Sequence, residues 1–451
     1  MKDGEPGSFC AGFCHNHNFY AKIVAKGHSN KQFLQKMKKR HRLSKQKIVE
    51  RKILVMLAFF STSVGLWENF RQLWLQDNGF SAADVSIVTS VGLVLSVVGV
   101  IFVGYRLKMS HLKGFMTVTL GIKLVDLMIL RSLDATNSFW LMSACTAIDV
   151  ITSYLIIASV YPLITTIIKN NEIYSKRKLV EYWFRDIGVL VGGIVLGQTF
   201  LGSLIDYNAC LVISVIFLTL AIATMSTFKV KATEKEPPRS DSILKYVMKS
   251  KLQRFYMAYA FLAAMSFAAA LGLKMLVLTN YLNFSAGTAT NYLLIVGLLS
   301  DVVGVLALKY FTPKNDYLTL TLKFGIRLLA YVIAIIADDP FVSMLAITWS
   351  ILISTAYEDV TDGCYINLVD NRHQLSYSTI KYTMSILGEA AGMMLCGVTY
   401  NLGVGVILGA SAVITATQLG IAFYLIHLRR RRRSVRHSAS RMRYDERMID
   451  N

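Results

Sequence analysis

The chain places charged side chains inside stretches that are otherwise strongly apolar. In residues 65–75, GLWENFRQLWL, a carboxylate and a guanidinium, Glu68 and Arg71, lie three residues apart. A Lys, Arg or Asp at the centre of a membrane helix costs about 2.5 to 3.5 kcal/mol even on a lenient insertion scale. Each such group therefore needs an oppositely charged partner, water or a role in binding a solute or a proton.

Other apolar stretches repeat this pattern along the whole chain. A helical bundle could not hide so many charges against lipid, so we expect them to face a polar cavity in its interior. The charged residues inside apolar stretches are Glu68, Arg71, Lys123, Asp126, Asp149, Glu181, Arg185, Asp186, Lys274, Asp301, Arg327, Glu358, Asp359, Asp362, Lys381 and Glu389.

Four of the carboxylates fall near the expected midplane of the membrane. A carboxyl group in a poorly solvated cavity binds a proton more readily than one in water, because its charged form is disfavoured. These four are therefore candidates for proton coupling. The alternative for each is a static salt bridge or hydrogen bond between helices. They are Glu68, Asp149, Asp301 and Glu389.

Two cations, Arg71 and Lys274, fall near the outer third of the membrane. Either could hold an anionic group of a solute, and that binding would be linked to protonation of Glu68. As an alternative, Glu68 and Arg71 simply neutralise each other on one helix face. Four neighbours are expected to contact the same solute, namely Asn69, Gln72, Tyr154 and Tyr357.

A further set falls in the cytoplasmic third and is predicted to form a gate. Ion pairs within it would close the inner side of the cavity and break when the protein changes conformation. Two other cations, Lys123 and Arg327, are expected to be structural, with Lys123 bonded to Asp126 and to neighbouring helices. The gate residues are Glu181, Arg185, Asp186, Glu358, Asp359, Asp362 and Lys381.

The elements that carry these residues must be membrane helices. The 451 residues are 54% hydrophobic and 17% charged, with a mean hydropathy of +0.46, which indicates an integral membrane protein. Crossing about 30 Å of hydrocarbon takes about 20 apolar residues. The sequence predicts an all-α protein with twelve spans, at residues 53–76, 84–104, 114–131, 139–166, 179–203, 208–228, 254–279, 288–308, 317–337, 341–366, 378–401 and 405–427.

Lys and Arg are concentrated in alternate loops, which predicts that both termini lie in the cytoplasm. The predicted organisation is a basic, disordered leader (1–52), an N-terminal six-helix bundle (53–228), a cytoplasmic linker (229–253), a C-terminal six-helix bundle (254–427) and a basic tail (428–451). Met37 would make a natural start, so residues 1–36 are expected to be disordered or absent from the mature protein. The net charge of +20 belongs largely to these tails, interpreted as anchors beside anionic lipids.

The two halves also repeat each other at nearly constant offset, which predicts two pseudo-symmetric bundles. Residues 80–82 and 284–286 are both Phe-Ser-Ala, and 97–100 and 302–305 are both Val-Val-Gly-Val. Gly188, Gly192 and Gly197 match Gly388, Gly392 and Gly397. Glycines at this spacing let membrane helices approach closely.

Two six-helix halves, a basic central loop, the segment GFSAADVSIVTS and glycine-rich fifth and eleventh spans resemble the major facilitator superfamily of secondary transporters. The resemblance covers residues 53–427. It departs at the loop after the second span, where Lys108 stands in place of the family's Asp, and the fifth span lacks the proline of the drug-antiporter motif. The subfamily is therefore left open.

The sequence thus predicts a secondary active transporter of a small polar or charged organic solute, working by alternating access and coupled to protons. The alternatives are a proton-driven exporter of drugs or amphiphiles and a lipid flippase or scramblase on the same scaffold. We expect a monomer in the cell membrane, without enzymatic activity, cofactor or metal. The leader segment CAGFCHNH fits no zinc spacing well, and the run Arg429–Arg433 lacks the aromatic interleaving of a nucleic-acid site.

Overall fold

The structure is a computed structural model that describes residues 30–133, 138–167, 172–197, 207–227, 251–310, 316–337, 339–366 and 374–449. The chain divides into two compact units, Met1–Arg51 and Lys52–Asn451. The described part of the first unit, residues 30–51, is helical. The helices and contacts below belong to the second unit, whose N-terminal half (residues 52–227) and C-terminal half (residues 251–449) are named here by sequence.

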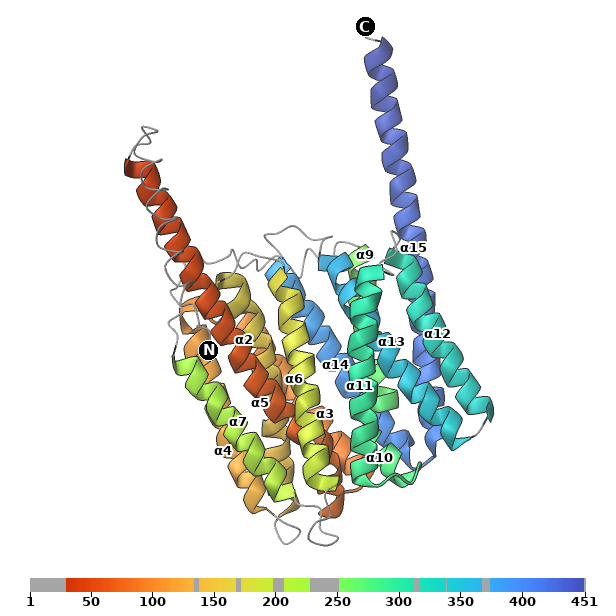
Figure 1. Ribbon diagram of the computed structural model, residues 1–451. Coiled ribbons are helices and arrows are strands. Elements are labelled where there is room, and N and C mark those ends of the chain that lie inside the picture. Colours follow the sequence, from red (N-terminus) through yellow and green to blue (C-terminus); the bar gives the residue numbers. More distant parts are fainter. Residues whose placement is uncertain are drawn as a thin grey trace, which may run out of the picture. The chain divides into compact units, whose positions relative to one another are not determined.

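Every regular element in the described residues is a helix, and in Figure 1 the helices of the second unit lie side by side. The N-terminal half contains α2 (Asn30–Asp77), α3 (Ala82–Tyr105), α4 (Met109–Ser132), α5 (Phe139–Ile167), α6 (Glu172–Gly197) and α7 (Tyr207–Ser226). The C-terminal half contains α9 (Lys251–Leu271), α10 (Lys274–Asn280), α11 (Ala286–Tyr310), α12 (Asp316–Ala337), α13 (Pro340–Ile366), α14 (Gln374–Tyr400) and α15 (Val404–Ile449).

Eleven of the twelve predicted spans fall largely on a single helix and the seventh falls on α9 and α10, although the ends of the fifth and sixth spans lie outside the described residues. Six segments of the described chain are long and apolar enough to cross a membrane on length and composition alone: Ile48–Asp77, Ala82–Tyr105, Phe139–Val160, Tyr207–Ser226, Gln253–Asn280 and Val404–His427. Most of the other helices carry several of the predicted intramembrane charges, which lowers their mean hydropathy. The chain is therefore an all-helical, multi-pass membrane protein, and crossing by the remaining helices stays a prediction.

Helix packing in one half has a counterpart in the other. In the N-terminal half α5 packs on α3 and α4, and α4 packs on α7. In the C-terminal half α13 packs on α11 and α12, and α12 packs on α15. Between the halves, α3 packs on α14 and α11 packs on α6. These two contacts are also counterparts, because α3 and α11 hold the same place in their halves, as do α6 and α14.

The repeated Phe-Ser-Ala segment starts the second helix of each half. Ser81 and Ser285 each accept, through Oγ, a hydrogen bond from the backbone N–H three residues later, at 3.2 and 3.1 Å. This capping satisfies an N–H that has no partner within the helix. Two residues before each serine the backbone turns through the left-handed region, at Gly79 (φ 88°) and Asn283 (φ 54°). The sequence repeat thus encodes the same turn and cap twice.

A buried serine contact also occurs twice. Ser214 Oγ donates to the carbonyl of Ser63 at 2.7 Å, joining α7 to α2. Ser411 Oγ donates to the carbonyl of Ser266 at 3.1 Å, joining α15 to α9. Hydroxyl groups of this kind hold membrane helices together where lipid provides no hydrophobic drive for association.

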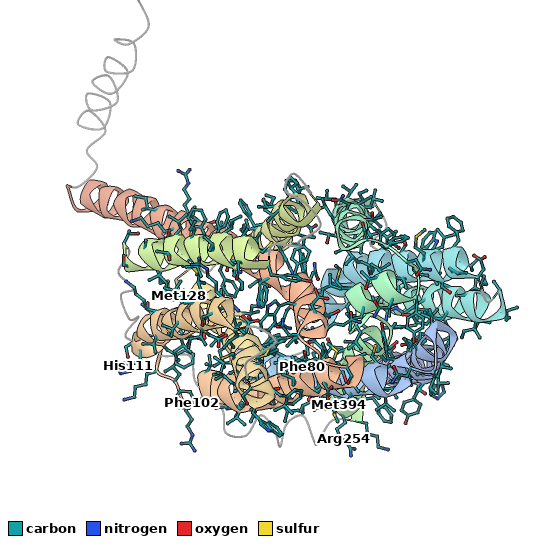
Figure 2. The ribbon with its side chains drawn as sticks, turned by 90° about the horizontal axis from the view of Figure 1, so that it is seen from below. Phe80, Phe102, His111, Met128, Arg254 and Met394 are labelled. Atoms are coloured by element: carbon teal, nitrogen blue, oxygen red, sulfur yellow. The ribbon has the colours of Figure 1, made fainter. Side chains whose placement is uncertain are left out.

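The bundle is apolar outside and charged inside. Trp140 and Ile336 are both 78% exposed, and Phe102 and Met394 lie near the rim in the view along the helices (Figure 2). Lys123, by contrast, is only 2% exposed. This distribution is the one expected when lipid surrounds the helices and charged groups must face the interior.

Two glycines, one in α14 and one in α15, provide a test of the packing. A Cβ added at Gly388 would lie 2.0 Å from the carbonyl oxygen of Phe261 in α9, whereas one added at Gly420 would have no neighbour within 4 Å. We expect Gly388→Ala to lower the free energy of unfolding by about 1 to 3 kcal/mol or more, because two backbones must separate. Gly420→Ala, the matched control, should be neutral or stabilising, since Ala favours helix. Thermal unfolding of the purified protein in detergent measures both, and equal effects would contradict this packing.

Candidate functional site

The predicted seventh span is not one continuous helix. α9 ends at Leu271 and α10 begins at Lys274, with Gly272 and Leu273 in a turn between them. The carbonyl oxygen of Gly272 accepts a hydrogen bond from Gln72 Nε2 at 2.7 Å. Gln72 lies on α2, so this bond joins the first helix of the N-terminal half to the break in the C-terminal half. The break also places Lys274 at the start of a new helix.

Glu68 and Arg185 form an ion pair between α2 and α6, with Arg185 Nη2 2.5 Å from Glu68 Oε2. Close helix approach makes this possible, because a Cβ added at Gly65 would lie 2.0 Å from the backbone oxygen of Arg185. The side chains of Arg185 and Glu68 are 38% and 37% exposed. Both side chains also interact electrostatically with Lys274 of the C-terminal half. We therefore interpret their accessible surface as facing the interior of the bundle rather than lipid.

Lys274 is the second cation beside this pair. It interacts electrostatically with Arg185, Glu68, Asp186 and Glu389. These groups come from α2, α6, α10 and α14, so both halves contribute charges to one region. We call these five residues the central charge cluster.

Two contacts hold the other acids of the cluster. The carboxylate of Asp186 on α6 packs against Gly297 on α11, where an added Cβ would lie 2.9 Å from Asp186 Oδ1. Glu389 on α14 interacts electrostatically with Tyr154 on α5. Tyr154 also stacks on Tyr382 of α14, with ring centroids 6.4 Å apart. Both acids therefore lie at contacts between the halves.

A separate buried network lies within the N-terminal half. Arg71 Nη1 donates to Asp149 Oδ2 at 2.6 Å, and Lys123 Nζ forms an ion pair with the other carboxylate oxygen of Asp149. Lys123 also donates to Ser153 Oγ at 2.8 Å. Asp126 interacts electrostatically with Lys123, Arg71 and Asp149, and its Oδ2 is buried without a hydrogen-bond partner among the described residues. Two cations thus share one carboxylate while a second carboxyl lies beside them.

Several expected pairings differ in the structure. Arg71 forms an ion pair with Asp149 and Glu68 forms one with Arg185, so the two charges of the opening segment interact electrostatically but are not directly paired. Lys123 forms an ion pair with Asp149 on the neighbouring α5, whereas Asp126, one turn away, interacts with it only electrostatically. Arg71 and Lys274, expected at nearly equivalent positions, both interact electrostatically with Glu68, and of the two Arg71 has an ion pair among the described residues.

The helix that carries Arg185, α6, begins earlier than predicted. The helix starts at Glu172, whereas the sequence predicted a span from residue 179. Arg185 thus lies thirteen residues, about 20 Å, along the helix. It is placed beside Glu68, among the residues expected near the midplane.

The other predicted site residues are placed as follows. Asn69 is buried on α2, and Glu181 interacts electrostatically with Arg185. Lys381 lies on α14. The side chains of five predicted residues lie outside those described, namely Asp301, Tyr357, Glu358, Asp359 and Asp362.

Sequence reasoning missed three features of this region: the break at Gly272, the contact of Gly297 with Asp186, and the stacking of Tyr382. The first two are glycines in apolar helices, where glycine is common and carries no specific signal. The position of Tyr382 in this region could have been inferred from the sequence, because Tyr382 lies two turns before Glu389 on the same face of one helix.

The fold is shared with solved transporters. The nucleoside transporter NupG matches with a TM-score of 0.63 at 11% identity, over 84% of this chain and 98% of that one. A bacterial homologue of the human lysosomal transporter Spinster, inward-facing and occupied, matches with a TM-score of 0.61 at 14% identity, over 84% and 97%. The human organic anion transporter MFSD10 matches with a TM-score of 0.60 at 11% identity, over 84% and 99%.

These matches show a shared fold: the chain has the helical architecture of solved membrane transporters. At such low sequence identity the matches show a shared fold only and assign no subfamily. Sequence searches find no matching family model and no similar curated protein.

The buried network can be tested by a double-mutant cycle. Removing one partner of a buried ion pair costs about 3 to 5 kcal/mol, because the other charge is left uncompensated. We expect Asp149→Asn to lower the free energy of unfolding by that amount. Adding Lys123→Met should recover part of the loss, since one unpaired cation disappears. Asp77→Asn, at an exposed carboxylate on the same α2 as Arg71, should cost less than about 1 kcal/mol. Strictly additive effects of Asp149→Asn and Lys123→Met would show that the two side chains are not coupled.

Proposed function

We propose that the protein is a secondary active transporter that moves a small polar or charged organic solute across the cell membrane by alternating access, coupled to protons. Its twelve spans form two pseudo-symmetric six-helix bundles, with both termini in the cytoplasm. The matched helix contacts, caps and serine bonds of the two halves support this arrangement. Transport by the solved proteins of the same fold supports the class of activity.

The central charge cluster is the observation that carries the proposal. Five charged side chains from both halves meet beside a helix break, and more than a third of the Glu68 and Arg185 side chains is accessible. A structural ion pair in a membrane protein would be sealed from water, because sealing strengthens it. Discontinuous helices near the midplane line substrate sites in many transporters. A hydrated, charged site at the contact between two halves is what alternating access requires.

Glu68 is proposed as the main proton-coupling group. As a carboxylate it holds Arg185 at 2.5 Å. A proton on Glu68 removes that ion pair and frees Arg185, so protonation and the position of α6 against α2 are linked. Asp149 can act in the same way on Arg71, and Glu389 can act on its contact with Tyr154. Asp301 completes the proposed coupling set.

The substrate path is proposed to run past Lys274, Gln72 and Tyr154. Arg71 joins it when Asp149 releases the guanidinium, and Asn69 and Tyr357 complete the wall. The cytoplasmic gate is proposed to use Glu181, Glu358, Asp359, Asp362 and Lys381, together with Arg185 and Asp186. Arg185 and Asp186 also belong to the central charge cluster and so couple the gate to the site.

A proton-driven exporter of drugs or amphiphiles would use the same residues to move its solute out of the cell. A lipid flippase or scramblase would need a lateral path for a headgroup and two acyl chains. The central charge cluster consists of charged side chains and lies between helices of both halves. This favours a compact polar solute over a lipid. We propose a monomer without cofactor or enzymatic activity.

A solute screen tests the class of function. A ligand present at one hundred times its Kd raises the free energy of unfolding by about 2.7 kcal/mol. Thermal unfolding against a broad solute panel at two pH values should therefore identify stabilising solutes, and proteoliposomes should accumulate them. Movement of fluorescent phospholipid between leaflets, with no solute accumulated, would favour the lipid transporter instead.

The Glu68→Gln variant tests proton coupling. The amide side chain that this substitution introduces cannot exchange a proton in the physiological range, so accumulation of solute against its gradient should fall at least tenfold and lose its pH dependence. Exchange of labelled for unlabelled solute at equal pH needs no net proton movement and should persist. Asp77→Asn, on the same helix and exposed, is the matched control and should keep the normal pH profile. A normal profile in Glu68→Gln would remove Glu68 from the coupling role.

A further inference from the structure

Two members of the central charge cluster, Lys274 and Asp186, have no direct partner in the described part of the chain. Arg185 and Glu68 form an ion pair with each other, and Glu389 interacts electrostatically with Tyr154. The ammonium group of Lys274 forms neither an ion pair nor a hydrogen bond with any described residue, and the same is true of the Asp186 carboxylate. Each interacts with the other only through space. One cation and one anion are thus left over in the same region.

Such an arrangement is costly unless something else completes it. Both side chains are half-buried, so each charge has lost part of its hydration without gaining a bonded partner among the described residues. Lys274 lies on α10 and Asp186 lies on α6, in different halves. The Asp186 carboxylate packs against Gly297 of α11, where an added Cβ would lie 2.9 Å from Asp186 Oδ1. A bound solute with complementary charges would satisfy both groups at once.

We propose that the transported solute is a zwitterion, with its carboxylate on Lys274 and its cationic nitrogen on Asp186. This inference rests on the proposed transporter function and names the substrate class of the same site. An anion alone would pair with Lys274 but leave Asp186 unpaired, and a cation alone would do the reverse. A zwitterion adds no net charge to the cavity. Because it bridges α10 and α6, its binding also draws the two halves together.

The test uses probes that differ by one charge. The probes are the neutral amino acids and their dipeptides, the same compounds with the amine acetylated, and the same compounds with the carboxylate amidated. The purified full-length protein should be stabilised against thermal unfolding by members of the first set only. Removing either charge should weaken binding roughly tenfold to hundredfold, as expected for one charge-assisted hydrogen bond.

Variants assign each charge to its residue. Lys274→Gln should abolish the difference between a zwitterion and its amidated form, and Asp186→Asn should abolish the difference between a zwitterion and its acetylated form. Gly297→Ala keeps both charges but displaces the Asp186 carboxylate, so it should weaken zwitterion binding in the same way as Asp186→Asn. The matched controls are Lys108→Gln and Asp77→Asn, which change exposed charges outside the cluster and should leave both differences intact.

The outcomes separate this inference from the function on which it rests. Equal stabilisation by a zwitterion and by its singly charged forms would overturn the zwitterion assignment and leave transport standing. Stabilisation and accumulation only of solutes from other classes, such as sugars or nucleosides, would do the same. Failure of every solute to be accumulated would overturn the transporter proposal itself.

Discussion

The cost of placing a charge in a medium of low dielectric constant governs this structure. Lipid surrounds helices whose outer faces carry exposed Trp, Ile, Val and Phe side chains, while the charged groups point inward. Each charge in the interior must then be neutralised by another one. The two networks solve this problem differently. Arg71, Lys123 and Asp149 are sealed and mutually bonded, whereas the central charge cluster is accessible and incompletely paired.

The two networks also differ in where they lie in the fold. The sealed network joins α2, α4 and α5 within one half. The open cluster lies where α2, α6, α10 and α14 of both halves meet. Glycine contacts allow α6 to approach α2 and α14 to approach α9 closely. The protein thus combines a sealed ion network within one half with an accessible charge cluster at the contact between the halves, an arrangement that suits the proposed alternating access.

Sequence reasoning predicted the helices and the repeat well, because both depend on patterns along the chain. Apolar length locates helices, and the Phe-Ser-Ala repeat encodes the caps at Ser81 and Ser285. Pairings between helices were predicted poorly, because they depend on which faces meet. Lys123 bonds to a partner 26 residues away rather than to one a single turn away. The start of α6 was predicted too late, because the polar residues that begin this helix resemble a loop in the sequence.

The central claim is that solute and protons move together through a site built around Glu68 and Arg185. The most direct measurement is the pH of a lightly buffered suspension of proteoliposomes when a solute identified by thermal stabilisation is added outside. The account predicts a pH change that accompanies solute uptake, scales with it and disappears when an uncoupler is present. Solute uptake at the full rate with no accompanying pH change, in liposomes shown to hold a pH gradient, would contradict it.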